Sequence, residues 1–145
     1  MTTSQTPAHA ARHTLTRSAA ARPLRTFLAL DAAVTAANGL IYLLAAGPVG
    51  DLLGLGSGLL RGIGAFLTAY GALVALLASR PVPGRAATKA VIEANALWAL
   101  ASVATAVFGW FGPNTVGTVW TVLQAAVVAV FAALQASALR RLGDR

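Results

Sequence analysis

The sequence predicts an all-α polytopic membrane protein, built as a bundle of four antiparallel transmembrane helices. Three observations predict this class: 57% of the 145 residues are hydrophobic, only 10% are charged, and the mean hydropathy is +0.72. A soluble domain carries about 25% charged residues, so the excess of apolar side chains here has to face lipid. So short a chain cannot enclose that many apolar side chains in a single core.

Four apolar segments account for this excess, over about 26–46, 59–79, 90–108 and 115–139. Each is long enough to cross a hydrocarbon core of about 30 Å at about 1.5 Å per residue. Backbone groups in lipid must bond within their own segment, and the alternation typical of a membrane barrel is missing, so we expect helices. All six prolines fall outside or at the edges of these segments, where helices should end.

The predicted transmembrane domain covers residues 23–142, and its short connections make successive helices antiparallel neighbours. Residues 1–22 are rich in Thr, Ala, Ser and Arg and lack an apolar period, so they are predicted to be a disordered basic tail. The alternative is that the first apolar segment is a cleaved signal peptide. Asp31 within that segment and the three later spans argue against cleavage.

Basic residues flank the apolar segments on one side of the membrane. They are Arg12, Arg17, Arg22 and Arg25 before the first segment, Arg80, Arg85 and Lys89 after the second, and Arg140, Arg141 and Arg145 after the fourth. The other two connections hold only Asp51, with Arg61 just inside the second segment. Because excess Lys and Arg stay in the cytoplasm, we expect a multi-pass protein of the inner (plasma) membrane with both termini cytoplasmic. Trp110, Phe111 and Trp120 would then belong to an outer aromatic belt.

The two halves of the chain resemble one another. Each has an Asn-bearing helix (Asn38, Asn95), a Gly-Pro turn, and a return helix rich in Ala, Val and Leu that ends in Ser and Arg. This pattern predicts two tandem helical hairpins related by a pseudo-two-fold axis along the membrane normal. Shared composition alone is the alternative explanation.

Two acids lie within the apolar segments, at similar depths from the cytoplasmic side: Asp31 in the first and Glu93 in the third. An acid in a membrane helix costs about 2.5 kcal/mol or more and is a functional candidate by default. If the two carboxyl groups approach each other, burial and like charge favour the protonated form of one of them. We therefore name both as catalytic candidates, with a local pair between Glu93 and Lys89 as the alternative for Glu93.

Polar and aromatic residues of the four segments form the predicted substrate-binding set. They are Asn38, Tyr42, Tyr70, Asn95, Trp98 and Gln124. On the first helix Asp31, Thr35, Asn38 and Tyr42 recur every three or four residues, so they share one face. The alternative is that such side chains only hold helices together in lipid.

Gly54, Gly58 and Gly62 recur every four residues and predict a close helix contact, either within the monomer or in a homodimer. The chain has no cysteine, and its two histidines, His9 and His13, lie in the tail. We therefore predict no metal site, no cofactor and no Ser-His-Asp catalytic set. The basic residues adjoin apolar segments, which favours a lipid bilayer and a lipophilic small molecule as partners over nucleic acid.

In size, helix count and intramembrane acids Asp31 and Glu93, the chain resembles the small membrane-bound terpene cyclases of bacteria. The resemblance implies that a carboxylic acid protonates an alkene or epoxide and that ring closure follows. Tyr42, Tyr70 and Trp98 would then be aromatic walls for the developing cation. Acid-initiated cyclisation is accordingly the most specific reaction that we expect.

Two further resemblances suggest other functions. Four helices with an acid in the first resemble small multidrug transporters, which implies proton-coupled export, although those proteins have Glu where this chain has Asp31. Spans rich in Ala, Val and Leu, with Arg favoured over Lys, resemble uncharacterised four-helix integral membrane proteins of high-GC bacteria. The third class of function is a non-catalytic membrane accessory or assembly subunit.

Overall fold

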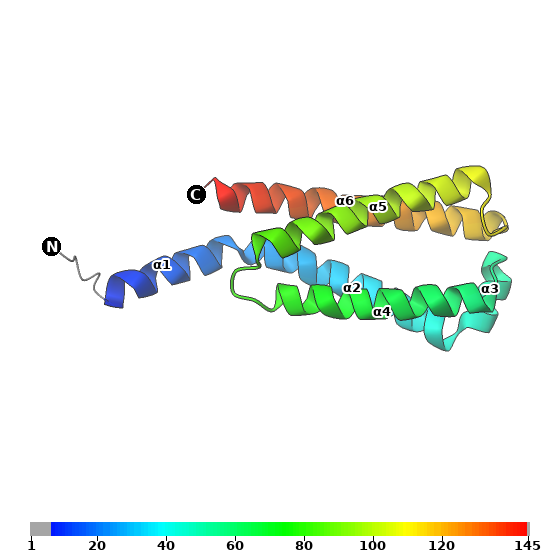
Figure 1. The fold of residues 1–145 in the computed structure, drawn as a ribbon, viewed down its shortest axis with the longest axis horizontal. Helices are drawn as coiled ribbons and strands as arrows, with labels where there is room; N and C mark the ends of the chain where they lie inside the picture. The colour runs from blue at the N-terminus through cyan, green and yellow to red at the C-terminus, as the bar shows by residue number, and fades with distance from the viewer. Residues whose placement is uncertain (1–6, 145) are drawn as a thin grey trace.

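The computed structural model describes residues 7–144, with side chains from residue 10 onward. Its helices are α1 (Pro7–Ala20), α2 (Arg22–Leu44), α3 (Ala46–Leu53), α4 (Ser57–Ala78), α5 (Arg85–Phe108) and α6 (Thr115–Gly143). Four of them, α2, α4, α5 and α6, are long and apolar enough to cross a membrane (Figure 1). The predicted all-α bundle of four antiparallel transmembrane helices is confirmed.

The four long helices form two hairpins, α2 with α4 and α5 with α6 (Figure 1). Between the hairpins α2 packs on α6, whereas α4 and α5 meet mainly through side chains because their backbones are further apart. The helix backbones are therefore closer together along the α2–α6 side than along the α4–α5 side. The halves are not equivalent in detail, because Asn38 lies about four and a half turns into α2 and Asn95 about three turns into α5.

Small residues bring α2 and α4 close together. A Cβ added at Gly64 would lie 2.7 Å from the carbonyl oxygen of Gly39, and one added at Gly71 would lie 2.9 Å from the Cβ of Ala36. Such contacts are a main source of helix association in lipid, where no hydrophobic effect drives helices together. This close approach makes α2 and α4 the tightest pair of the bundle.

Of the predicted contact face of Gly54, Gly58 and Gly62, only Gly54 makes a close contact within the monomer, where an added Cβ would lie 2.6 Å from Asn114 N. A Cβ at Gly58 or Gly62 would meet nothing within 4 Å. Gly54 is not on α4 at all, because it ends α3 with φ of 70° in the left-handed region that favours glycine. The sequence spacing of four therefore crosses a turn and does not mark one continuous helix face.

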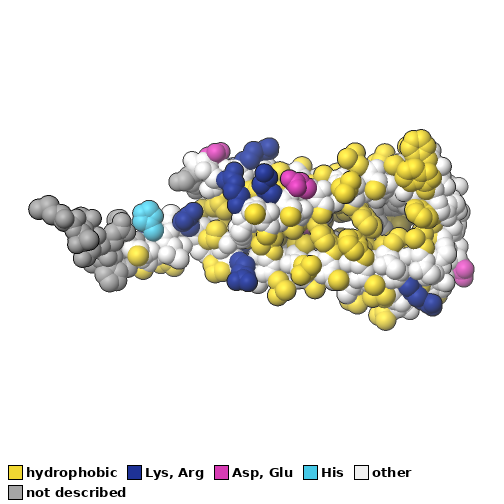
Figure 2. All heavy atoms as spheres, in the orientation of Figure 1, with side chains coloured by type: hydrophobic (Ala, Val, Ile, Leu, Met, Phe, Trp, Pro, Cys, Tyr) yellow, Lys and Arg dark blue, Asp and Glu magenta, His cyan; other side chains and the backbone are white. Residues whose placement is uncertain are grey.

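The end of the bundle where α2 and α5 begin and α4 and α6 end is called the basic end. Figure 2 shows most of the visible Lys and Arg side chains gathered there, and hydrophobic side chains mainly over the middle and distal parts, where a basic and an acidic side chain are also visible. The main buried cluster lies toward the basic end and unites all four long helices: Leu24, Leu28, Ala32, Val74, Ala78, Val91, Ala138 and Leu139. The hairpins are therefore packed together there, and they meet again at the opposite, distal end, where α3 contacts α6.

The distal end is closed by Asn114, which precedes α6. Its side-chain oxygen accepts from Gly117 N at 2.9 Å and caps α6, and its Nδ2 donates to Leu52 O of α3 at 3.0 Å. Its backbone N–H donates to Leu53 O at 3.0 Å. Gly117 touches Leu53 O so closely that no larger residue fits. The short helix α3, which the sequence did not predict, thus supplies carbonyl groups that join the two hairpins.

The sequence predicted a disordered tail over residues 1–22, but Pro7–Ala20 is helical. Residues 1–6 lie outside the described part. Alanine and arginine are good helix formers, and this propensity acts without an apolar period. Ala21 N donates to Arg17 O at 3.0 Å, so the turn continues into α2, where Pro23 occupies the first turn that tolerates it.

The long helices also extend past the predicted spans. The helix α5 begins at Arg85, five residues before the predicted start, with Gly84 as its N-cap residue. The helix α6 continues to Gly143, with Arg140 and Arg141 in its last turn. Hydropathy detects only the part of a helix that lies in lipid, so helical turns that carry charged residues outside it were missed.

Candidate ligand-binding site

Asp31 lies at the centre of a buried group of hydrogen bonds. Its side chain is 1% exposed, and Oδ2 accepts from Asn95 Nδ2 at 2.7 Å and from Gln135 Nε2 at 2.8 Å. Thr35 Oγ1 donates to Oδ1 at 3.2 Å. All three donors are neutral and come from α2, α5 and α6, so the carboxyl group ties these helices together.

The fourth helix joins through Tyr70 of α4. Its hydroxyl lies 3.1 Å from Asn95 Oδ1 and 3.3 Å from Val91 O, and its single hydrogen is shared between these two acceptors. The oxygen of the Asn95 amide therefore faces Tyr70, and its nitrogen faces Asp31. We call Asp31, Thr35, Tyr70, Asn95 and Gln135 the Asp31 network; among the described residues, no buried side-chain nitrogen or oxygen is without a hydrogen-bond partner.

A second group of hydrogen bonds lies further along α2, toward the distal end. The Tyr42 hydroxyl accepts from Trp120 Nε1 at 2.7 Å and from Gln124 Nε2 at 2.6 Å. Asn38 Nδ2 donates to Gln124 Oε1 at 3.2 Å. These four residues, the Tyr42 network, join α2 to α6.

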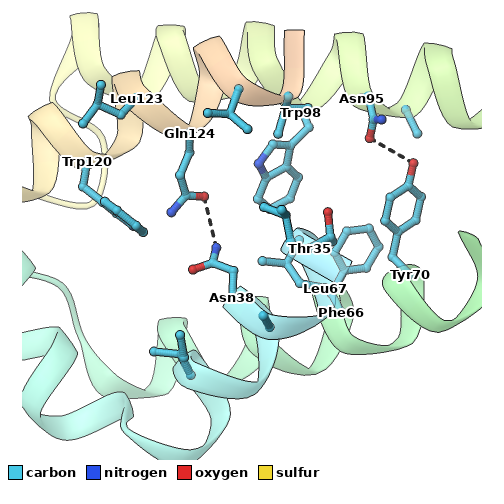
Figure 3. A pocket seen from close by; sticks show the side chains of 16 residues that line it. Thr35, Asn38, Phe66, Leu67, Tyr70, Asn95, Trp98, Trp120, Leu123 and Gln124 are labelled. Atoms are coloured by element: carbon cyan, nitrogen blue, oxygen red, sulfur yellow. Dashed lines mark hydrogen bonds between the residues drawn. The ribbon is translucent and has the colours of Figure 1, made fainter. Parts of the chain in front are cut away.

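A cavity of about 400 Å³ lies between the two hairpins, and polar members of both networks face it (Figure 3). It is lined by Val34, Thr35, Ala37, Asn38, Ile41, Phe66, Leu67, Tyr70, Ala94, Asn95, Trp98, Trp120, Leu123, Gln124, Val127 and Val128. Figure 2 shows a recess among hydrophobic side chains in the distal half of the molecule, on the side where α4 and α5 separate. A second cavity of about 300 Å³, toward the distal end, shares Trp98, Trp120 and Gln124 with the first.

Aromatic rings form the wall on the α4–α5 side. Phe66 stacks on Tyr70 with ring centroids 5.9 Å apart and on Trp98 with centroids 5.8 Å apart, at interplanar angles of 15° in both pairs. The stack links α4 to α5 where their backbones are apart (Figure 3). Such ring faces pack against flat apolar groups and attract cations.

The structure places all six predicted binding residues around these cavities. Asn38, Tyr70, Asn95, Trp98 and Gln124 line the first cavity, and Tyr42 lines the second. Their common role in binding stays a prediction.

The two predicted catalytic acids are placed differently from one another. Asp31 lies behind Thr35 and Asn95 and lines neither cavity. Glu93 is exposed, as is Lys89 one turn earlier, so the two acids do not share a site. Glu93 and Asn95 are two positions apart on α5, about 200° around the helix, and Asn95 is the residue that faces inward.

Sequence reasoning left several site residues out of the predicted set: Thr35, Phe66, Leu67, Trp120 and Gln135. Gln124 and Gln135 are eleven positions apart, about three turns, so they share one face of α6. This spacing is enough to place Gln135 on the same side as Gln124 from the sequence. Trp120 was expected in an outer aromatic belt, yet its indole N–H donates inward to Tyr42. Phe66 and Leu67 are apolar residues in an apolar helix, and nothing local distinguishes them.

Within the described residues, no group of three His, Cys, Asp or Glu side chains could hold a metal ion. The side chain of His9 lies outside the described part. Fold and cavity together define a polytopic helical membrane protein with a ligand-sized space among its transmembrane helices. No family model, curated protein or solved structure matches this chain.

Proposed function

We propose that this protein binds a lipophilic small molecule in the cavity between its two hairpins. The observation that carries the proposal is a cavity of about 400 Å³ with an apolar wall and six hydrogen-bonding side chains of the two networks on it. Sites for small molecules have this composition and volumes of about 300–1,000 Å³. The recess in Figure 2 opens on the face where the backbones of α4 and α5 are apart, so the molecule would enter from the bilayer.

Acid-initiated cyclisation of the bound molecule is the second candidate function, and the stack of Phe66, Tyr70 and Trp98 beside the cavity favours it. Asp31 would have to act through Thr35, whose hydroxyl contacts Asp31 and also lines the cavity. In that case Thr35→Val should abolish turnover of an alkene or epoxide substrate while the substrate still binds. Export of the bound molecule would instead release it unchanged.

We infer that the basic end of the bundle faces the cytoplasm and that the protein resides in the inner (plasma) membrane. Support comes from Arg22, Arg25, Arg80, Arg85, Lys89, Arg140 and Arg141, which lie together at that end. The distal connections carry only Asp51 and the nearby Arg61. Retention of Lys and Arg on the cytoplasmic side gives this orientation, with both termini inside.

A homodimer through the outer face of α4 is a further proposal. Gly58 and Gly62 face open space there, and small residues allow close packing of a second helix in lipid. Gly62→Leu should then shift a dimer to a monomer in crosslinking or energy-transfer measurements in nanodiscs. A dimer that withstands this change would use another surface.

The binding proposal is tested with 1-bromododecane, whose bromine quenches tryptophan fluorescence on contact. Trp98 and Trp120 line the cavity, so titration of the protein in nanodiscs should give saturable quenching. Ala94→Phe places a ring in the cavity and should weaken the apparent affinity about tenfold or more.

Ala96→Phe is the matched control, because Ala96 is exposed on another face of the same helix. It should leave the affinity unchanged. Quenching that does not saturate, or that is identical in both variants and the wild type, overturns the proposal.

A further inference from the structure

The Tyr42 hydroxyl accepts two hydrogen bonds, so its own hydrogen is what is left for a ligand. A phenol oxygen can accept hydrogen bonds and has one hydrogen to donate. Here the oxygen accepts from both Trp120 Nε1 (2.7 Å) and Gln124 Nε2 (2.6 Å). Within the described residues its own hydrogen is donated to no protein group, although Tyr42 is only 5% exposed and lines the second cavity.

A spare donor is present whichever way the two amides are oriented. The indole of Trp120 can only donate, so Tyr42 must accept from it. In the alternative arrangement the oxygen and nitrogen of the Gln124 amide exchange places, and Tyr42 donates to Gln124 Oε1. Gln124 Nε2 then faces Asn38, so the Asn38 amide must also be flipped to present its oxygen as the acceptor. The Asn38 nitrogen, which belongs to a residue lining the first cavity, is then left without an acceptor. In both arrangements the Tyr42 network has a spare donor beside a cavity.

From this we propose that the ligand carries an uncharged acceptor oxygen, such as a ketone or ester carbonyl, which accepts a hydrogen bond from the Tyr42 network. The inference rests on the proposed function and adds the chemical class of the ligand. An anion is disfavoured, because every donor in the network is neutral and a charge within the membrane is costly. A cation is disfavoured because no acidic side chain lines either cavity and Asp31 lies behind Thr35 and Asn95.

The position of the network also defines how the rest of the ligand lies. Gln124 and Trp120 line both cavities, so the acceptor oxygen would bind where the two cavities meet. An apolar body would then extend toward the Asp31 network along Leu67 and Trp98, or toward Phe111 at the distal end. The ligand is therefore an elongated neutral lipid with its oxygen part-way along or at one end of an apolar chain.

The test uses two probes of equal length, 2-tridecanone labelled with ¹³C at the carbonyl and the alkane tridecane. Infrared difference spectra of the protein in nanodiscs should show the labelled carbonyl band shifted to lower frequency than in protein-free nanodiscs. In competition with 1-bromododecane the ketone should bind about fivefold more tightly than the alkane, as one hydrogen bond provides. Tyr42→Phe should remove the shift.

Thr121→Val is the control variant. It removes another hydroxyl from the second cavity, but one that already donates to Gly117 O at 2.8 Å, so the shift should remain. If Tyr42→Phe does not fold, the ketone and alkane comparison on the wild type still decides the matter. Equal affinities with no band shift overturn the acceptor proposal and leave binding intact. Failure of all three probes to bind overturns the proposed function itself.

Discussion

Asn95 donates a 2.7 Å hydrogen bond to Asp31 with the nitrogen of its amide and accepts a 3.1 Å hydrogen bond from Tyr70 with the oxygen. One buried side chain thereby joins α2, α4 and α5. It also places the carboxyl group behind the cavity wall, because Asn95 itself lines the cavity and Asp31 does not. Asp31 accordingly holds the bundle together, and any chemistry at this carboxyl group must pass through a neighbour.

Replacing the buried carboxyl group should destabilise the protein. Asp31→Leu leaves Gln135 and Thr35 without this acceptor and leaves Asn95 only its 3.4 Å bond to Gln135, so it should lower the free energy of unfolding by about 1–3 kcal/mol. Glu93→Leu changes the other intramembrane acid, which is exposed, and should have little effect. Thermal unfolding in detergent, followed by size-exclusion chromatography, measures both. Equal loss of stability in the two variants would contradict a special role for Asp31.

The close approach of α2 and α4 gives a second prediction. In Gly64→Ala the new Cβ would lie 2.7 Å from Gly39 O, so the helices must separate, at a cost of about 1–3 kcal/mol. Gly62→Ala, two positions away on the same helix, meets nothing within 4 Å and should stabilise α4 by up to about 1 kcal/mol. The same thermal measurement compares them. A stable Gly64→Ala protein would mean that this contact does not hold the hairpin together.

Asn114 should be important for the distal end. Asn114→Ala removes the cap of α6 and the bond to Leu52 O, and should cost about 1–2 kcal/mol. Asn114→Ser keeps a capping oxygen but cannot reach Leu52, so it separates the two contributions. Faster hydrogen exchange of the amides of α3 and of the first turn of α6 is the expected signature. Unchanged exchange in α3 would show that Asn114 does not join the hairpins.

Membrane orientation is tested by single cysteines, which this cysteine-free chain allows without further changes. Asp51→Cys at the distal end should react with a membrane-impermeant maleimide in intact cells. Val82→Cys, in the exposed connection at the basic end, should react only after lysis. The reverse pattern would place the basic end outside and refute the orientation inferred from the arginines.

The sequence indicated which face of α2 carries the site, but not that the site consists of two separate hydrogen-bond networks. The spacing of Asp31, Thr35, Asn38 and Tyr42 correctly places them on one side of α2. The structure separates them into two networks with different partners, because α6 contributes Gln135 at one depth and Gln124 at another. Glu93 could not be distinguished from Asp31 by depth alone, since only helix rotation turns one acid inward and leaves the other exposed.

Some properties of this protein follow from the sequence alone. Hydropathy, span length and the positions of Pro and Arg are local properties, and they suffice for the number of transmembrane helices, their approximate ends and the polar residues among them. The cavity and its contacts were decided only by the tertiary structure. They depend on how far the hairpins separate and how each helix is rotated, which follow from contacts such as Gly39 with Gly64 and Asn95 with Asp31 between residues distant in the chain.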